Sequence, residues 1–497
     1  MQRREFVSRT LALAAATGFV NPRWARANPS ADVPAISRSG SALVLKAADI
    51  ADLRSNLRGP VLTRTSEGYD VARRIWNGAF DRHPALIARC ANAADVMTAV
   101  QFAASNDLLV AIRGGGHSLP GLSVCEGGIM IDLALMQGVR VDRKTRDVRV
   151  EPGVLLGTMD RATQAAGLVV PAGTVSHTGV AGLTLGGGVG RLQRKFGLTV
   201  DCLVGAEMVT AAGKLVHCNA GENPDLLWAL QGGGGNFGVV TSFQYRAFEF
   251  DGTAIAGGIV FPIEQARRVL DAFASYCETA SDDLWMDPVL ECDAAGRRQL
   301  NFTLCHCGDA ASAAKDVAAI RKFGKVVRDT VAEKPWVALQ SEFDGDSPHG
   351  RGYYMSGGRI TKLIPAMLDH AVASIQRPGA ELGKVSLTQH GGVSARRPTA
   401  STAYASRDAS HNFVVRAAWD DPQQAVARTA WQKETWKGFA PYSVGLYANL
   451  NAADASVKAR SAYGENLERL VEVKTQYDPK NLFHLNPNIQ PRTAQTQ

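Results

Sequence analysis

The sequence predicts an α+β protein with two folded domains, and three features of the chain support this. The 497 residues exceed the roughly 250–300 residues that one hydrophobic core usually supports. From about residue 52 to residue 250, strand-like and helix-like segments alternate and clustered glycines separate them. From about residue 252 to residue 453, glycine clusters are rarer and helices alternate with strands. The second pattern is typical of an α+β domain built on an antiparallel sheet.

Residues 1–27 have the pattern of an export signal. Arg3 and Arg4 precede an apolar run from Leu11 to Val20, and Ala25-Arg26-Ala27 has the small residues of a cleavage site. A twin arginine before such a run is typical of the bacterial route that exports folded proteins, and the run is too short to span a bilayer stably. An ordinary secretory signal or a retained anchor is the alternative. We expect a periplasmic or secreted protein that engages the twin-arginine export machinery and has no stable membrane insertion.

Composition and charge argue against several classes of function. The formal net charge is +7, but lysine and arginine are scattered, so we expect no nucleic-acid partner and at most a weak attraction for anionic ligands. The eight cysteines contain no CxxC pair, which argues against a zinc framework. Cys305-His306-Cys307 lies in an alternating strand pattern, where neighbours face opposite ways, so we expect no metal there. An oxidising compartment permits disulfides, and the sequence leaves their pairing open.

Residues 28–78 are interpreted as a lead-in and the start of the first domain, and residues 79–251 as its main part. Asn223-Pro224 is expected to cap a helix, with proline in its first turn. The expected helices here are Ala93–Ser105, Gly157–Ala166 and Asp225–Leu230, and the expected strands are Leu108–Ile112, Gly128–Leu133, Asp201–Thr210 and Leu215–His217.

Residues 252–453 are interpreted as a second domain, and residues 454–497 as a separate C-terminal segment that begins with a charged helix. The expected helices of the second domain include Ile263–Cys277, Ala310–Phe323 and Ile364–Ile375, and the expected strands include Gln299–Cys307 and Asn412–Ala418.

Three glycine clusters lie in the first domain, at residues 114–116, 186–190 and 232–238. Glycine lets backbone N–H groups approach a ligand closely, and successive N–H groups can form a concave site for an anion. The pyrophosphate of a dinucleotide is the obvious ligand for such sites. Each cluster alone could be no more than a turn, but three clusters in this interval favour a binding role.

Several common catalytic motifs are absent or stand in the wrong context. Gly233, Gly235 and Gly238 have the spacing of the Rossmann fingerprint, but a helical pattern precedes them and a strand follows, which reverses the required order. The chain has no Walker motif, no HExxH and no G-x-S-x-G. Phosphoryl transfer, zinc proteolysis and α/β-hydrolase chemistry therefore lack support.

His117 ends the first glycine cluster, directly after Arg113-Gly114-Gly115-Gly116 and at the end of an expected strand. A lone histidine is usually a surface or core residue. An imidazole nitrogen is nucleophilic near neutral pH, however, and in this place it could attack an electrophilic cofactor held by the same loop.

Taken together, these motifs resemble the FAD-linked oxidases of the berberine bridge enzyme type, within the vanillyl-alcohol oxidase fold. The resemblance implies a PCMH-type FAD-binding domain of two α/β subdomains and a substrate domain whose antiparallel sheet is covered by helices. It also implies that residues 454–497 return to the FAD domain. The motifs that carry it are residues 111–118, 128–132, 179–188, 236–241, 447–449 and 477–483.

The resemblance implies that His117 bonds covalently to FAD as an 8α-histidyl link. Many members add a second bond from a cysteine in a Gly-Thr-Cys motif, but the matching residues here are Gly173-Thr174-Val175, so we expect a single link. Cys125 does not lie at the family's cysteine position. The other residues expected to contact FAD are Arg113, Gly114, Gly115, Gly116, Ser118, Thr178, Gly179, Gly182, Gly186, Gly187, Gly190, Gly238, Val239, Val240 and Asn486.

Tyr447 matches the tyrosine of the family's Tyr-x-Asn motif and is the candidate base. A free tyrosine has a pKa of about 10, so a nearby cation or hydrogen bonds must lower this value for work near neutral pH. Asn449 could hold that geometry, and Arg407 is the candidate cation. A buried aromatic residue in a sheet is the alternative interpretation of Tyr447. The lysine that relatives often carry is replaced by Met355.

These residues favour an oxidase that takes hydride from an alcohol, sugar or cyclic amine and makes hydrogen peroxide. Thr178 lies where the family places a residue thought to gate oxygen, and its small side chain is compatible with O2 as a partner. A dehydrogenase with a quinone or protein acceptor is the first alternative, and a non-catalytic exported binding protein is the second. The substrate is left open. The candidates for its pocket are Trp285, Tyr353, His390, Tyr404 and Trp419.

Overall fold

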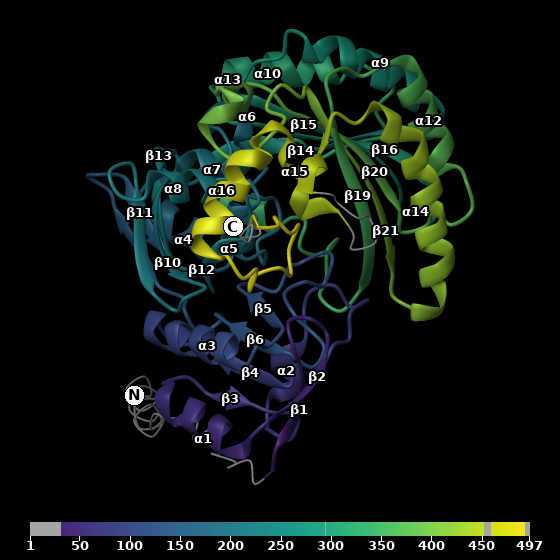
Figure 1. The fold of residues 1–497 in the computed structure, drawn as a ribbon. Helices are drawn as coiled ribbons and strands as arrows, with labels where there is room; N and C mark the ends of the chain where they lie inside the picture. Colours follow the sequence, from purple (N-terminus) through teal and green to yellow (C-terminus); the bar gives the residue numbers. More distant parts are fainter. Residues whose placement is uncertain (1–30, 294, 452–458, 493–497) are drawn as a thin grey trace, which may run out of the picture.

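The computed structural model describes residues 31–293, 295–451 and 459–492, and it has the expected α+β architecture. The first domain occupies the bottom and left of Figure 1, in purple to teal, and the second lies at the top right, in green. The C-terminal segment, in yellow, lies between them (Figure 1). The export pattern of residues 1–27 falls outside the described residues. No helix in the described ranges has both the length and the apolar character that crossing a membrane requires.

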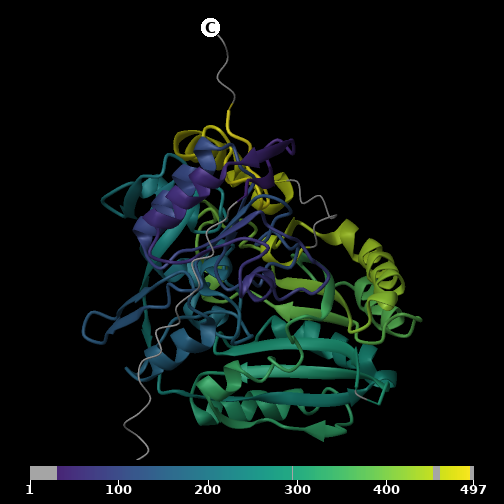
Figure 2. The ribbon, with the colours of Figure 1, turned by 90° about the horizontal axis from the view of Figure 1, so that it is seen from below.

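The N-terminal subdomain is built on a four-stranded sheet of order β3-β4-β6-β5. Strand β6 is parallel to both β4 and β5, and helix α3 connects β4 with β5 and packs beside α1 (Figure 2). Strand β5 ends at Arg113, so the first glycine cluster starts at the end of a buried strand. The elements are β1 (Val33–Ile36), β2 (Ala42–Leu45), α1 (Ala47–Asn56), β3 (Val61–Leu62), α2 (Tyr69–Arg73), β4 (Leu86–Arg89), α3 (Ala93–Ser105), β5 (Val110–Arg113) and β6 (Ile129–Asp132).

The second subdomain has an antiparallel sheet of order β11-β10-β12-β8-β7. Its core includes Phe237, Phe243 and Tyr245, which are fully buried. The elements are β7 (Val139–Asp142), β8 (Asp147–Val150), α4 (Leu156–Gln164), β9 (Leu168–Val169), α5 (Val180–Leu185), α6 (Gln193–Phe196), α7 (Thr199–Cys202), β10 (Leu203–Thr210), β11 (Leu215–Asn219), α8 (Pro224–Leu230), β12 (Gly238–Arg246) and β13 (Phe248–Glu249).

The second domain has a nine-stranded sheet whose main path runs β17-β14-β16-β15-β20-β21-β19-β22. Helices α9, α10, α12 and α14 cover one face of it (Figure 1). The elements are β14 (Thr253–Pro262), α9 (Ala266–Cys277), β15 (Leu284–Cys292), β16 (Arg298–His306), α10 (Ala310–Ile320), β17 (Arg328–Asp329), β18 (Ala332–Pro335), α11 (Trp336–Gln340), β19 (Gly352–Ile360), α12 (Pro365–Ile375), β20 (Lys384–Gln389), α13 (Val393–Arg396), β21 (His411–Trp419), α14 (Ala425–Phe439) and β22 (Gly445–Leu446).

The two faces of this sheet differ in character because side chains alternate along each strand. On β20, Val385 and Leu387 belong to the apolar core beneath the helices, whereas Lys384, Ser386 and Thr388 face the opposite way and line a cavity. The sheet therefore buries one face against helices and presents a polar face toward the first domain.

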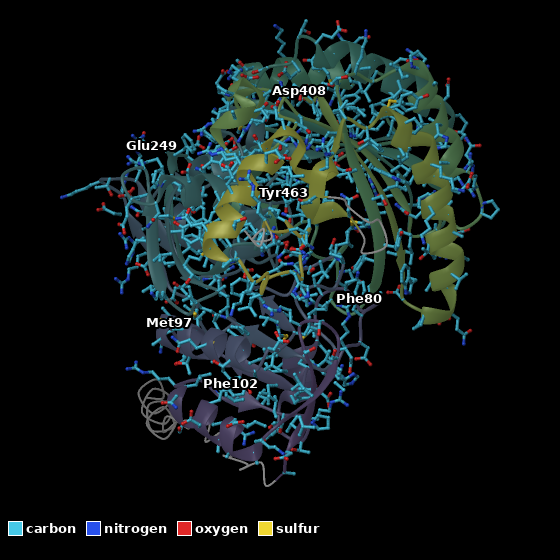
Figure 3. The ribbon with its side chains drawn as sticks, viewed as in Figure 1. Phe80, Met97, Phe102, Glu249, Asp408 and Tyr463 are labelled. Atoms are coloured by element: carbon cyan, nitrogen blue, oxygen red, sulfur yellow. The ribbon has the colours of Figure 1, made fainter. Side chains whose placement is uncertain are left out.

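The C-terminal segment returns to the first domain, with α15 (Ala459–Tyr463) and α16 (Leu467–Tyr477). Tyr463, labelled at the centre of Figure 3, belongs to the core of the second subdomain. Its hydroxyl donates to the carbonyls of Gly233, at 3.2 Å, and Pro487, at 3.0 Å. These bonds tie the last glycine cluster to the end of the chain.

The expected elements are largely confirmed, and the helix Ala93–Ser105 has the expected bounds. One local expectation is wrong. The strand expected from Asp201 begins at Leu203, because the Asp201 carboxylate accepts from the N–H of Leu198 and supports the short helix α7. Asn223 is at the N-cap of α8 and Pro224 in its first turn, as expected; the Asn223 side chain makes no bond to the helix, and its amide donates to the carbonyl of His217.

Candidate active site

A cavity of about 540 Å³ lies between the glycine loops of the first domain and the polar sheet face of the second. It receives residues from the C-terminal segment as well. The residues expected to contact FAD or substrate that line it are Gly114, Gly115, Gly116, His117, Ser118, Gly173, Thr174, Val175, Thr178, Gly179, Gly182, Gly186, Gly190, Gly238, Tyr447, Asn449, Asn486 and Trp285. The fold thus brings most of the expected residues to one place.

Close backbone approaches explain several of the glycines around the cavity. A Cβ on Gly115 would lie 2.4 Å from the Cα of Gly179, so the first glycine cluster packs backbone against backbone on the residue that precedes α5. A Cβ on Gly186 would lie 2.2 Å from Oδ1 of Asn449. These contacts place the loops and the Tyr-x-Asn segment in one compact wall.

The residues present fit a dinucleotide such as FAD. Gly182 and Gly235 line the cavity, and a Cβ on either would meet no atom within 4 Å, so side chains there would fill space that a ligand needs. The Oδ1 atom of Asn486 is buried without a hydrogen-bond partner and lies at the same wall. A buried polar atom of this kind normally has a partner, which a bound ligand would supply.

His117 lies at the edge of the glycine cradle, stacked on Trp76 with ring centroids 4.3 Å apart. Its Nε2 meets Nδ1 of His177 at 3.0 Å. Burial, with smaller contributions from His177 and His349, lowers the pKa of His117 to about 3. The imidazole is therefore neutral at physiological pH, which is the form that can act as a nucleophile.

The loop of residues 173–176 is held by hydrogen bonds from the second domain. The amide of Gln340 donates to the carbonyl of Gly173 at 2.9 Å. Asp344 accepts from the backbone N–H of Ser176 at 2.8 Å and from its hydroxyl at 2.6 Å. Val175 presents a hydrocarbon side chain at the cavity, so this position offers no sulfur.

Tyr447 is buried at the cavity wall, and its oxygen accepts from the N–H of Gly188 and from the amide of Asn449, both at 3.2 Å. Burial raises the pKa of Tyr447 above its ordinary value, and the lowering by these donors and by Arg359 does not cancel that effect. The hydroxyl therefore stays protonated at neutral pH. Tyr447 is placed to form hydrogen bonds rather than to act as a resident phenolate.

The expectation that Arg407 is the cation beside Tyr447 is wrong. Arg407 is buried in an ion pair with Asp201, with Nη2 and Oδ1 2.6 Å apart. The guanidinium near Tyr447 belongs to Arg359, 5.8 Å from that ring and 4.2 Å from the ring of Tyr404. The sequence analysis missed Arg359 because β19 and β22 become neighbours only in the fold.

Some expected residues do not line the cavity. Arg113 lies behind the first glycine loop and approaches Asp132, with Nε and Oδ1 3.8 Å apart. Gly187 packs against the ring of Tyr404. The side chains of Val239 and Val240 belong to the cores on the two faces of β12. Cys125 lies in the core of the N-terminal subdomain. Of the pocket candidates, Tyr353, His390, Tyr404 and Trp419 are not among the residues that line the cavity.

The polar sheet face was largely missed by the sequence analysis. The alternation of Lys384, Ser386 and Thr388 with apolar residues was a signal that β20 has one polar, buried face. Without the fold, this pattern is indistinguishable from a solvent-exposed strand. The residues of this group at the cavity are Asp287, Glu291, Asn301, Thr303, Lys384, Ser386, Thr388, Asn412 and Arg416.

Comparison with protein families matches residues 84–219 to an FAD binding domain and residues 446–490 to the berberine and berberine-like family. The (R)-6-hydroxynicotine oxidase of Paenarthrobacter nicotinovorans is 31% identical over 88% of this chain and 97% of its own. An FAD-linked oxidoreductase of Dictyostelium discoideum is 29% identical over 88% of this chain and 95% of its own.

Solved structures agree with these matches. The 6-hydroxy-D-nicotine oxidase of Arthrobacter nicotinovorans superposes with a TM-score of 0.79 at 27% identity, over 88% of this chain and 98% of that one. A chitooligosaccharide oxidase superposes with a TM-score of 0.81 at 25% identity, over 90% and 100%. The cavity, the order of its glycine loops and these relatives lead to one assignment: the chain belongs to the berberine bridge enzyme-like FAD-linked oxidoreductases, with the PCMH-type vanillyl-alcohol oxidase fold.

Proposed function

We propose that this FAD-linked oxidoreductase is an oxidase that carries FAD through a single covalent bond to His117. It takes hydride from an alcohol, sugar or cyclic amine, and O2 then accepts the electrons to give hydrogen peroxide. The observation that carries the proposal is the neutral imidazole of His117, placed at the edge of a glycine cradle that opens into the cavity. The relatives named as oxidases that act on 6-hydroxynicotine and on chitooligosaccharides support this class of substrate.

The chain's own residues have separable roles in this proposal. The bound FAD supplies the redox chemistry as hydride acceptor. The glycine loops and Asn486 hold the dinucleotide, and the brace from Gln340 and Asp344 fixes the loop that relatives tether through sulfur. The amide of Asn449 and the N–H of Gly188 donate hydrogen bonds to the Tyr447 oxygen and so fix the position of its hydroxyl. The polar sheet face binds and orients the substrate.

Measuring peroxide tests the proposed reaction. Purified protein is mixed with sugars, aromatic alcohols and amines, and bleaching of the yellow flavin identifies the substrate. We expect one peroxide for each substrate molecule oxidised, because the two electrons of the hydride reduce one O2 to hydrogen peroxide; the small side chain of Thr178 at the cavity is compatible with O2 as the acceptor. Bleaching without peroxide, reversed only by a quinone, would identify a dehydrogenase. Purification of a colourless protein would identify a binding protein without catalysis.

We propose further that the chain is exported after folding, to the periplasm or beyond. The support is the sequence alone: Arg3 and Arg4 precede a short apolar run. In a bacterium with twin-arginine export, Arg3→Lys combined with Arg4→Lys should leave the flavoprotein in the cytoplasmic fraction. Arg9→Lys, outside the pair, is the matched control and should be exported. Unchanged export of the double variant would instead indicate an ordinary secretory signal.

A further inference from the structure

Among the described residues, Asp287 on β15 is the one carboxylate at the cavity that forms no ion pair. Its Oδ1 accepts from the hydroxyls of Ser386, at 2.5 Å, and Thr388, at 2.9 Å. Within the described ranges, no residue donates a hydrogen bond to Oδ2, and no cation lies within ion-pair distance of the carboxylate. Because Asp287 lines the cavity, it presents a free acceptor oxygen to the substrate space.

The other titratable groups at the cavity are held in ion pairs, stay protonated or have another proposed role. Glu291 and Asp346 share Lys384, whose Nζ lies 2.7 Å and 2.8 Å from their carboxylates. Burial raises the pKa values of Tyr447 and Tyr463 above the ordinary tyrosine value. His117 is the proposed FAD ligand. Arg416 is a cation and cannot accept a proton.

Asp287 belongs to a row of cross-strand neighbours that runs across the sheet and ends near Tyr447. Asp287 is opposite Thr303 on β16 and hydrogen-bonded to Thr388 on β20. Thr388 is opposite Asn412 on β21, and Asn412 is opposite Arg359 on β19. Arg359 reaches the ring of Tyr447. This row of paired residues therefore links the free carboxylate oxygen of Asp287 to the part of the cavity that Tyr447 lines.

We propose that Asp287 is the general base of substrate oxidation, an inference that rests on the proposed function. Its Oδ2 accepts the proton of the substrate's hydroxyl or amine. The substrate C–H bond breaks as hydride leaves with its electron pair for the bound FAD, which is reduced by two electrons. A C=O or C=N bond forms in the product. The proton leaves Asp287 for solvent, and O2 reoxidises the cofactor.

The electrostatic surroundings suit this role. Burial raises the pKa of Asp287 to about 6, while the hydroxyls of Ser386 and Thr388, and then Lys384 and Arg191, lower it. The other titratable groups on the strands packed against Asp287 are Glu291 on β15, Cys305 on β16 and Arg416 on β21. The carboxyl is ionised above about pH 6 and protonated below it. Because catalysis needs the ionised form, the rate should fall as the pH drops through about 6.

The test measures the rate of anaerobic flavin bleaching between pH 4.5 and 9. The substrate is the sugar, aromatic alcohol or amine that bleaches the wild-type flavin fastest. We expect Asp287→Asn to lower the limiting rate by about 10²–10⁴-fold, the usual contribution of a general base, and to abolish the fall near pH 6. Ser386→Ala should move this fall, the acid limb of the pH profile, to higher pH, because losing a donor to a carboxylate raises its pKa. Asp283→Asn is the control, since Asp283 pairs with Lys195 outside the cavity.

The outcomes separate this inference from the proposed function. If no compound bleaches the wild-type flavin, the proposed function fails and this inference falls with it. If wild type reacts and Asp287→Asn reacts equally fast with the same acid limb, only the base assignment fails. A higher KM with an unchanged limiting rate would make Asp287 a substrate anchor and would also overturn it. If Asp287→Asn does not retain flavin, the pH profile of Ser386→Ala decides. A fall in rate at the same pH as in the wild-type protein would refute the assignment.

Discussion

Replacing His117 with alanine is expected to leave a protein whose FAD is no longer covalently attached. In the wild-type protein, acid precipitation should leave all yellow colour in the pellet; in His117→Ala, all of it should pass into the supernatant. The physical reason is that the His117 imidazole is neutral, with a pKa of about 3. Its Nε2 is engaged by His177, so Nδ1 is the nitrogen that we expect to bond to FAD.

The control for this variant is His349→Ala, which removes another imidazole of the same cluster. The ring of His349 lies 6.1 Å from the ring of His117 and 4.8 Å from that of His177. Because His349 does not line the cavity, its loss should leave the colour in the pellet. Mass spectrometry of the intact chain gives an independent readout, since the FAD mass should be present in the control and absent in His117→Ala. A yellow pellet from His117→Ala would refute the proposed link.

The fold was predictable to the extent that local patterns determine it. The helix Ala93–Ser105 follows from apolar residues at helical spacing, and Asn92 caps it by accepting from the N–H of Asp95. The nine-stranded sheet follows less directly, because β15 pairs with β20 across about a hundred residues of chain. Pairings at that separation depend on tertiary packing, which no short window of sequence contains.

The candidate site also has one part that local sequence patterns predict and one part that they do not. The glycine loops and His117 could be predicted because close backbone approach leaves a mark in consecutive residues. The polar sheet face could not, because Asp287, Thr388 and Asn412 meet only through strand pairing. Arg407, the expected cation, pairs with Asp201 instead, whereas Arg359 reaches the ring of Tyr447 through the pairing of β19 with β22. The proposed substrate contacts therefore come mainly from the part of the site that local sequence patterns describe least.

The second large effect is expected at Lys474, which is fully buried and connects the C-terminal segment to the first domain. Its Nζ donates to the carbonyl of Asn236 at 2.8 Å, to Asp478 at 2.6 Å and to the carbonyl of Phe483 at 3.0 Å. Lys474→Met would leave a buried carboxylate without its cation. Removing one partner of a buried pair usually costs about 3–5 kcal/mol, and we expect a loss of that size in the free energy of unfolding, measured by urea denaturation.

A companion variant separates the charge effect from the loss of packing. Asp478 also accepts from the N–H groups of Leu482 and Phe483, so Lys474→Met with Asp478→Asn removes the unpaired charge but keeps an acceptor for one of them. This double variant should therefore be more stable than Lys474→Met alone. Glu472→Gln breaks an exposed pair with Arg492 and should cost only about 0–1 kcal/mol. If Lys474→Met costs no more than Glu472→Gln, the buried pair does not hold the C-terminal segment in place, and the anchoring must come from the apolar contacts of Leu470 and Val473.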